Sequence, residues 1–154
     1  MIILGIDPGI ARMGFGVVEE TKQKPRALAY GCFETSKDLA QAERLAKVHQ
    51  ELARLIKLHK PERVAVEKLF FSKNVKTALQ VGEARGVILM TCAELKVPVF
   101  EISPKEVKQA LTGYGSADKQ QMQKMVQLIL KLKAIPKPDD AADALAIALA
   151  GARL

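Results

Sequence analysis

The chain has 154 residues, 49% of them hydrophobic and 27% charged, which is enough for one domain with a sizeable core. These proportions exclude a disordered or collagen-like chain, and charges interrupt every apolar run well short of the roughly 18 residues of a membrane-spanning helix. Lysine and arginine number 24 against 17 aspartates and glutamates, so the net charge of +7 favours a polyanionic partner over a membrane.

The first part of the chain changes from a strand pattern to a helix pattern. An apolar run over residues 1–7 predicts a buried strand that ends at a Pro8-Gly9 turn. Two more strands are expected at 14–20 and 26–34, and their short spacing predicts an antiparallel meander. Apolar residues then recur every three or four positions from 39 to 58, which indicates an amphipathic helix with Ser36 as its cap.

The rest of the chain alternates strands with helices. Strands are expected at 63–67 and 97–102, with a helix over 74–95 between them. Ser103-Pro104 begins a helix that ends near Gly113, Ser116 is expected to cap another that reaches about 133, and an alanine-rich helix covers 139–153. Residues 1–154 are therefore predicted to form a single α/β domain, with a mixed five-stranded sheet covered by helices.

The N-terminus and the cysteines indicate a cytoplasmic protein. Met1 leads directly into the first strand, so we expect no secretory signal. Cys32 and Cys92 lie in apolar runs, and we interpret them as reduced thiols in the core.

Four carboxylates fall at the ends of predicted elements. Asp7 and Glu67 each close a short apolar strand, and strand ends in α/β sheets are where ligands usually bind. Asp140 and Asp143 are three apart at the start of the last helix, so they share one face, and the alanines between them allow the helix to lie close to the sheet. Hard oxygen donors without a histidine or cysteine cluster suit Mg²⁺ or Mn²⁺, and two such ions would activate water for phosphodiester cleavage.

Structural roles remain open for the same acids. Asp139, Asp140 and Asp143 would each stabilise the helix dipole by about 0.3–1 kcal/mol. Asp7 is also able to form an Asx-turn with Gly9. Glu67 repeats the position of Asp7 at a second strand end, and the nearby sequence offers neither acid a partner.

An aromatic pair among lysines follows the strand over 63–67. Phe70 and Phe71 stand side by side between Lys68 and Lys73, with Lys76 shortly after them. Stacking of a base on an aromatic ring contributes about 1–3 kcal/mol, and neighbouring lysines bind phosphates. We interpret this segment as a nucleic-acid contact with one ring presented and one buried; the alternative is that both rings are packed.

The basic excess lies in the middle of the sequence. Residues 68–137 carry 12 basic and 5 acidic groups, whereas residues 138–154 carry 1 basic and 3 acidic groups. Lys119 falls in the first turn of a predicted helix, where the dipole disfavours a cation and favours a phosphate. Together with Lys108 on the preceding helix it is a candidate phosphate contact, although either lysine alone is more often a solvated charge.

Several short motifs follow one another along almost the whole chain. They are Ile3-Leu-Gly-Ile-Asp7-Pro-Gly9, Gly14-Phe-Gly-Val17, Val66-Glu67, Phe70-Phe71, Ala84-Arg-Gly-Val87, Val107-Lys108-Gln, Gly113-Tyr-Gly-Ser-Ala-Asp-Lys119 and Asp140-Ala-Ala-Asp-Ala-Leu-Ala146. In this order the set resembles the bacterial Holliday junction resolvases of the RuvC family.

The resemblance implies an RNase H-like fold with helices on both faces of the sheet, and a metal-dependent endonuclease. Its substrate would be four-way junction DNA in recombination and repair, cut by paired symmetric nicks that leave 5′-phosphate and 3′-hydroxyl ends. By position, Asp7, Glu67, Asp140 and Asp143 would be the catalytic acids that bind two Mg²⁺ ions, for which Mn²⁺ can substitute.

The resemblance also implies binding residues and partners. Phe70 matches an aromatic residue that stacks on a base near the junction centre, and Lys108 and Lys119 match lysines near the scissile phosphate. The helix over 74–95 would form a homodimer contact, in which Gly82 and Gly86 permit a close helix approach. The expected protein partners are the branch-migration proteins RuvA and RuvB.

Four alternatives stay open at this point. Asp139 allows a one-residue slip in the third acid, although the spacing to Asp143 favours Asp140. The opening motif also resembles actin-like ATPases and sugar kinases, but those need a second domain for which this chain has no room. A non-catalytic junction-binding module and an RNase H-like nuclease acting on RNA are the other two.

Overall fold

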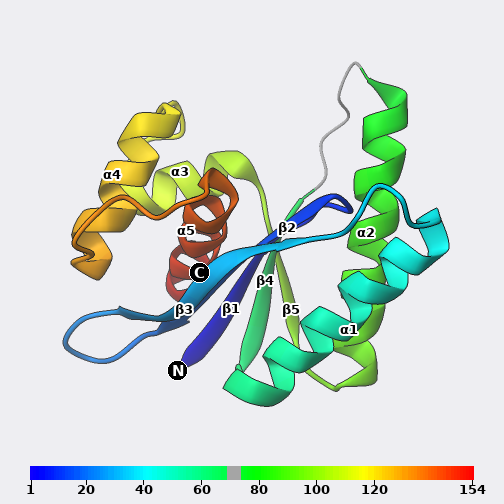
Figure 1. Ribbon diagram of the computed structural model, residues 1–154. Coiled ribbons are helices and arrows are strands. Elements are labelled where there is room, and N and C mark those ends of the chain that lie inside the picture. Colours follow the sequence, from blue (N-terminus) through cyan, green and yellow to red (C-terminus); the bar gives the residue numbers. More distant parts are fainter. Residues whose placement is uncertain (69–73) are drawn as a thin grey trace.

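A five-stranded mixed sheet forms the centre of the protein, described here from a computed structural model that covers residues 1–68 and 74–154 (Figure 1). The sheet order is β3-β2-β1-β4-β5, in which β1 pairs antiparallel with β2 and parallel with β4. The strands are β1 (Ile2–Asp7), β2 (Arg12–Glu19), β3 (Arg26–Glu34), β4 (Arg63–Glu67) and β5 (Val99–Ile102). The predicted antiparallel meander of the first three strands is confirmed.

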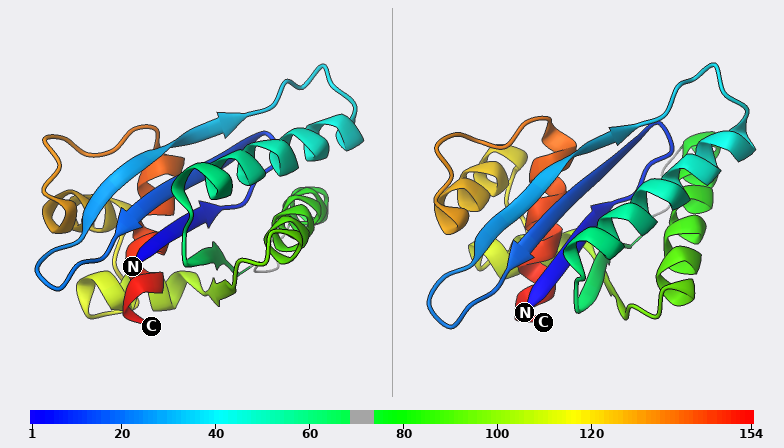
Figure 2. Two further views of the ribbon diagram at one scale, coloured as in Figure 1. Left: turned by 90° about the horizontal axis from the view of Figure 1, so that it is seen from below. Right: turned by 60° about the horizontal axis from the view of Figure 1, so that its bottom comes forward.

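Helices cover both faces of this sheet, as Figure 2 shows from two sides. The helices are α1 (Gln41–His59), α2 (Val75–Glu94), α3 (Pro104–Thr112), α4 (Lys119–Leu130) and α5 (Asp139–Arg153). One core cluster lies between the sheet and α1 and α2, and a second lies between the sheet and α3, α4 and α5. None of the helices in the described ranges is long and apolar enough to cross a membrane.

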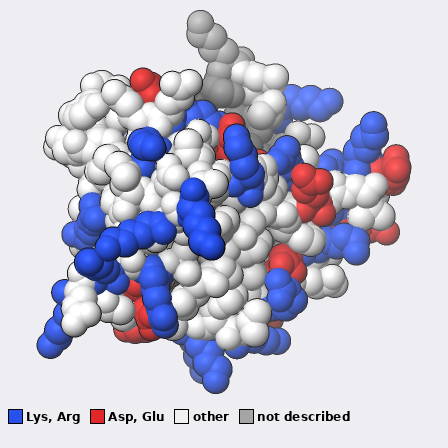
Figure 3. Space-filling view, turned by 60° about the vertical axis from the view of Figure 1, so that its left-hand side comes forward, with Lys and Arg blue, Asp and Glu red and all other residues white. Residues whose placement is uncertain are grey.

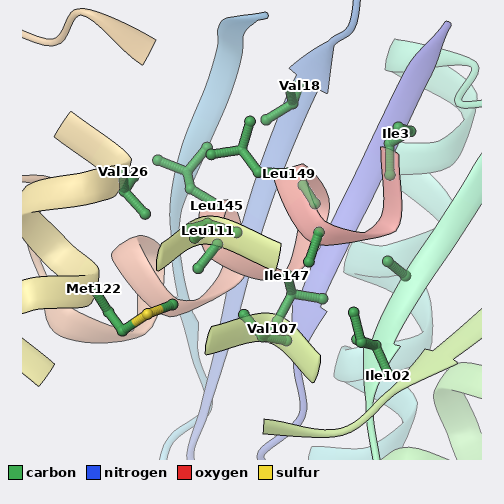
Figure 4. Close-up of a cluster of buried hydrophobic side chains, with 14 of the residues drawn as sticks. Ile3, Val18, Ile102, Val107, Leu111, Met122, Val126, Leu145, Ile147 and Leu149 are labelled. Carbon is green, nitrogen blue, oxygen red and sulfur yellow. The ribbon is translucent and has the colours of Figure 1, made fainter. Parts of the chain in front are cut away.

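Side chains alternate between the two cores along each strand, as a pleated strand requires. In β1, Leu4 and Ile6 face α1 and α2, whereas Ile3 belongs to the core beneath α5. Figure 4 shows this second core, in which Leu145 and Leu149 of α5 pack among side chains from the sheet. Asp7 continues the alternation of Ile3, so its position in the strand places it on the α5 face.

Glycines in β1 and β2 let α5 lie directly on the sheet. Gly5 and Gly16 are register partners, and a Cβ on Gly16 would lie only 2.7 Å from the backbone nitrogen of Leu145. A Cβ on Gly14 would overlap the backbone carbonyl of Asp140. The close approach therefore depends on these strand glycines as well as on the alanines of the helix.

Two predicted helix caps are wrong. Ser36 does not cap α1, whose N-cap is Ala40, because the Ser36 hydroxyl instead accepts a hydrogen bond from the backbone of Asp38. Asp118, not Ser116, caps α4: its carboxylate accepts from the Gln121 backbone at 2.8 Å while the Gln121 side chain accepts from the Asp118 backbone. This reciprocal pair satisfies two unpaired donors at once.

The other observed helix boundaries agree more closely with the predicted ones. Ser103 caps α3, and Gly113 ends it with φ of 84°. Helix α4 ends at Leu130, earlier than the predicted 133, because Lys131 adopts the left-handed conformation. Both cysteines are free thiols as predicted, but only Cys92 is buried in the core, whereas Cys32 is partly exposed near the start of α5.

Candidate active site

The carboxyl ends of β1 and β4 bring Asp7 and Glu67 to the same edge of the sheet. The two strands are parallel neighbours, with Ile6 opposite Val66, so the residue that follows each of them lies at the strand end. Ala65 belongs to the core beneath α5, and two residues later Glu67 points to that same side. The two acids therefore lie next to each other, on the face that α5 covers.

A pocket of about 200 Å³ opens at this edge, between the strand ends and the helices α3, α4 and α5. Asp7 and Glu67 line it from the sheet, and Asp143 lines it from the first two turns of α5. Lys108 of α3 and Lys119 of α4 line the same pocket. The structure thus brings together five of the predicted site residues, from five different elements.

The three carboxylates lie in an environment that disfavours their charged forms. Burial, followed by the charges of Glu67, Asp143 and Asp140, raises the pKa of Asp7 from 3.8 to about 8. Burial is also the main cause that raises the pKa of Glu67 and the pKa of Asp143. The negative charge of the pocket is therefore incompletely balanced by the protein.

The two pocket lysines offset part of this charge. Lys108 acts to lower the pKa of Glu67, and Lys119 acts to lower that of Asp7 and Asp143. Lys119 also forms an ion pair with Asp139 at 3.0 Å, and this contact lowers the pKa of the Asp139 carboxyl group. Asp139 is thus held by Lys119 and by Gln123 of the same helix, at 3.1 Å, and does not itself line the pocket.

Asp140 lies beside the pocket and is held by a residue that the sequence analysis missed. Its Oδ2 atom is 3.0 Å from Nε of Arg12 at the start of β2, and 3.9 Å from Sγ of Cys32 in β3. Asp140 does not line the pocket itself, but its charge contributes to the raised pKa of Asp7. Residues 12 and 140 are far apart in sequence, so only the fold reveals this pair.

The donor chemistry of the pocket fits divalent metal ions. The acids supply hard oxygen atoms, and their raised pKa values indicate negative charge that a cation would neutralise. Within residues 1–68 and 74–154, however, no three Asp, Glu, His or Cys side chains converge closely enough to form a ready-made metal site.

The structure describes little of the segment that is predicted to bind DNA. Phe70, Phe71 and Lys73 lie outside the described residues. Lys76 is exposed in the first turn of α2 and does not line the acidic pocket.

Comparison with known proteins identifies the family. The model of the family "Crossover junction endodeoxyribonuclease RuvC" matches residues 3–151. The chain belongs to the RuvC family. A RuvC from Roseiflexus sp. (strain RS-1) is 58% identical over 146 residues, which are 95% of this chain and 87% of the relative. A RuvC from Caldicellulosiruptor saccharolyticus is 51% identical over 97% of this chain and 90% of its own.

Solved structures agree with this RuvC assignment. Thermus thermophilus RuvC in complex with a Holliday junction substrate has a TM-score of 0.93 and 42% identity, over 99% of this chain and 93% of that one. The yeast mitochondrial resolvase Ydc2 shares the fold, with a TM-score of 0.71 and 15% identity. The match covers 96% of this chain and 76% of that one. The RNase H-like fold is thereby confirmed, and the alternative of an actin-like ATPase or sugar kinase is wrong.

Proposed function

We propose that the acidic pocket is the catalytic centre of a Holliday junction resolvase, where Asp7, Glu67, Asp140 and Asp143 hold divalent metal ions. Membership of the RuvC family supplies the reaction, since its members are crossover junction endodeoxyribonucleases. The observation that supports this location is the group of partly buried acids with raised pKa values in one pocket. Such clusters of perturbed groups in a pocket are typical of active sites.

Each residue of the pocket has its own task in this proposal. The carboxylates bind the cations, while Lys108 and Lys119 attract the scissile phosphate to the same pocket. Two bound Mg²⁺ ions, or Mn²⁺ in their place, would activate water and stabilise the leaving oxygen, so that 5′-phosphate and 3′-hydroxyl ends result. Arg12 holds one oxygen of Asp140 and thereby limits the orientations of that carboxylate.

Paired nicks require two catalytic centres, and we infer that α2 provides the contact of a homodimer. Val75, Leu79 and Met90 are 69%, 62% and 55% exposed, and together with Gly86 their spacing forms one stripe along this helix. Nothing lies within 4 Å of a Cβ built on Gly86. An apolar stripe with a small residue at its centre suits packing against a second copy of the same helix.

The remaining assignments follow the family resemblance. Phe70 and Phe71, with Lys73 and Lys76, would contact DNA near the junction centre. RuvA and RuvB are the proposed protein partners, and the cytoplasm is the proposed location because bacterial DNA lies there.

A cleavage assay tests this function. A four-way junction, a linear duplex and a structured RNA, each end-labelled, are incubated with the protein with and without Mg²⁺. We expect symmetric paired nicks in the junction alone, and only with the metal. Asp140→Asn should abolish them, whereas the matched change Asp139→Asn should retain them. Cutting without metal, or cutting of RNA instead, would refute the proposal.

A further inference from the structure

A second basic surface lies at the far end of α4 from the acidic pocket. It is formed by Lys22 and Lys24 in the β2–β3 turn and by Lys131 and Lys133 just after α4, and we call these four residues the lysine patch. The two views of Figure 2 both place the β2–β3 turn beside the end of α4. Figure 3, which presents this side of the molecule, shows lysine and arginine side chains gathered over it, with a smaller group of acidic side chains beside them at the lower left.

The fold holds like charges together in this patch. The β2–β3 turn is fixed by Thr21, whose hydroxyl donates to the Lys24 carbonyl at 2.8 Å and accepts from the Lys24 backbone at 3.1 Å. Lys131 caps α4, where the backbone of Leu132 donates to Gln127 at 3.0 Å. The side chain of Lys24 approaches Lys131 closely enough to lower the pKa of the latter.

No carboxylate of residues 1–68 and 74–154 forms an ion pair with any of the four lysines. On the same hairpin, Glu19 is paired with Arg26 across the strands, and one carboxylate oxygen of Glu20 is buried. Like charges brought together without a counter-ion are unfavourable, and a polyanion would relieve the repulsion. Lys22, Lys24, Lys131 and Lys133 are all exposed, so a large anion can reach the surface that they form.

Helix α4 connects the lysine patch to the acidic pocket. Lys119, its first residue, lines the pocket, and Lys131 follows its last residue. Twelve helical residues span roughly 18 Å at about 1.5 Å per residue. Along B-DNA this distance corresponds to about five base pairs at roughly 3.4 Å each.

We propose that the lysine patch binds the phosphate backbone of one junction arm, about five base pairs from the bond that is cut. The distance is counted from the acidic pocket, so this inference rests on the proposed function. The patch carries no aromatic or base-reading group, and its contact is therefore independent of sequence. It would fix the direction in which the arm leaves the active site.

The chain offers a matched pair of variants for the test. Lys24→Gln with Lys131→Gly removes two charges from the patch. The first double substitution is the patch variant; the control variant, Lys60→Gly with Lys96→Gly, removes two charges elsewhere. The three residues that become glycine, Lys60, Lys96 and Lys131, all have positive φ, at 48°, 57° and 53°. Glycine adopts this conformation without strain, so the glycine changes should not unfold either protein, which thermal unfolding will verify.

Junction affinity is measured at several salt concentrations with Ca²⁺ in place of Mg²⁺ to prevent cutting. For the patch variant we expect affinity to fall about five- to tenfold, and the slope of log K against log salt to decrease by about 2 for two lost phosphate contacts. The control variant should bind as the wild type does. Equal affinities and equal slopes for the patch and control variants would overturn the proposal. This is also the result expected if the patch binds a protein partner instead of DNA.

Uncharged methylphosphonates locate the contact. Placed about five base pairs from the cut bond, they should weaken binding by the wild type and have no further effect on the patch variant, while placement at other distances should weaken both equally. A loss independent of position would overturn the placement. Cutting of the unmodified junction by the wild type in Mg²⁺ is measured alongside, so that failure of the proposed function is seen separately.

Discussion

Asp7→Asn should make the metal-free protein more stable at neutral pH, although it removes a residue of the site. The pKa of Asp7 is raised from 3.8 to about 8, so the folded protein holds this proton more tightly than the unfolded chain does. The corresponding contribution to the free energy of unfolding is fully present below the unfolded value of 3.8 and is lost as the pH rises to about 8. Asparagine carries no charge at any of these pH values.

The size of the effect follows from the shift. One pKa unit corresponds to about 1.4 kcal/mol, which sets an upper limit of roughly 4 kcal/mol at pH 7. Because water still enters the pocket, we expect about 2–4 kcal/mol, equivalent to a rise in Tm of roughly 5–15 °C for a chain of this length.

Thermal and urea unfolding of wild type and Asp7→Asn, with a chelator, from pH 4 to pH 8.5 will measure this. The two proteins should have nearly equal stability at pH 4 and diverge as the pH rises. Mg²⁺ should stabilise the wild type and have much less effect on the variant. Asp139→Asn is the control of opposite sign, because Lys119 lowers the pKa of Asp139, and it should not gain stability at high pH. A pH-independent difference, or a less stable Asp7→Asn at pH 8, would refute the reasoning.

Three further changes test separate parts of the structure. Arg12→Ala should free the Asp140 carboxylate. The Mg²⁺ concentration needed for half-maximal cutting, and for the half-maximal shift in thermal-shift titrations, should rise about three- to tenfold, and Arg12→Lys should partly restore both. An unchanged Mg²⁺ requirement would contradict the positioning role. Gly16→Ala should lower the free energy of unfolding by about 1–3 kcal/mol, because its Cβ meets the α5 backbone; Gly31→Ala, which meets only a Phe ring, should cost less in urea unfolding. Leu79→Glu should give a monomer in sedimentation and unpaired nicks; a dimer that persists would exclude α2 as the contact.

The strand ends were predictable because their physics is local. A run such as Ile2 to Ile6 forms a buried strand, and the acid that closes it must lie at an edge of the sheet. Glu67 follows from the same logic, and the parallel pairing of β1 and β4 then makes the two acids neighbours.

The contacts around Asp140 were not predictable, because they depend on tertiary packing. Arg12 and Cys32 reach Asp140 only after β2 and β3 have paired and α5 has packed on them. A partial signal existed for the packing itself: Gly14 and Gly16 are two apart in a strand and so share one face.

The cap of α4 is a prediction that the sequence could have corrected. Asp118 with Gln121 three residues later is a capping-box pattern, and it satisfies more backbone donors than Ser116 would. The lysine patch, in contrast, joins a turn and a helix end that no local pattern connects.

The central claim is that the acidic pocket cuts the junction, and single-turnover cutting by Asp7→Asn tests it most directly. A labelled four-way junction is mixed with excess wild type or Asp7→Asn in Mg²⁺, and binding is measured in parallel with Ca²⁺. We predict that the variant binds the junction at least as tightly as the wild type and yields no paired nicks. Mg²⁺-dependent cutting by Asp7→Asn at the wild-type rate would contradict the account.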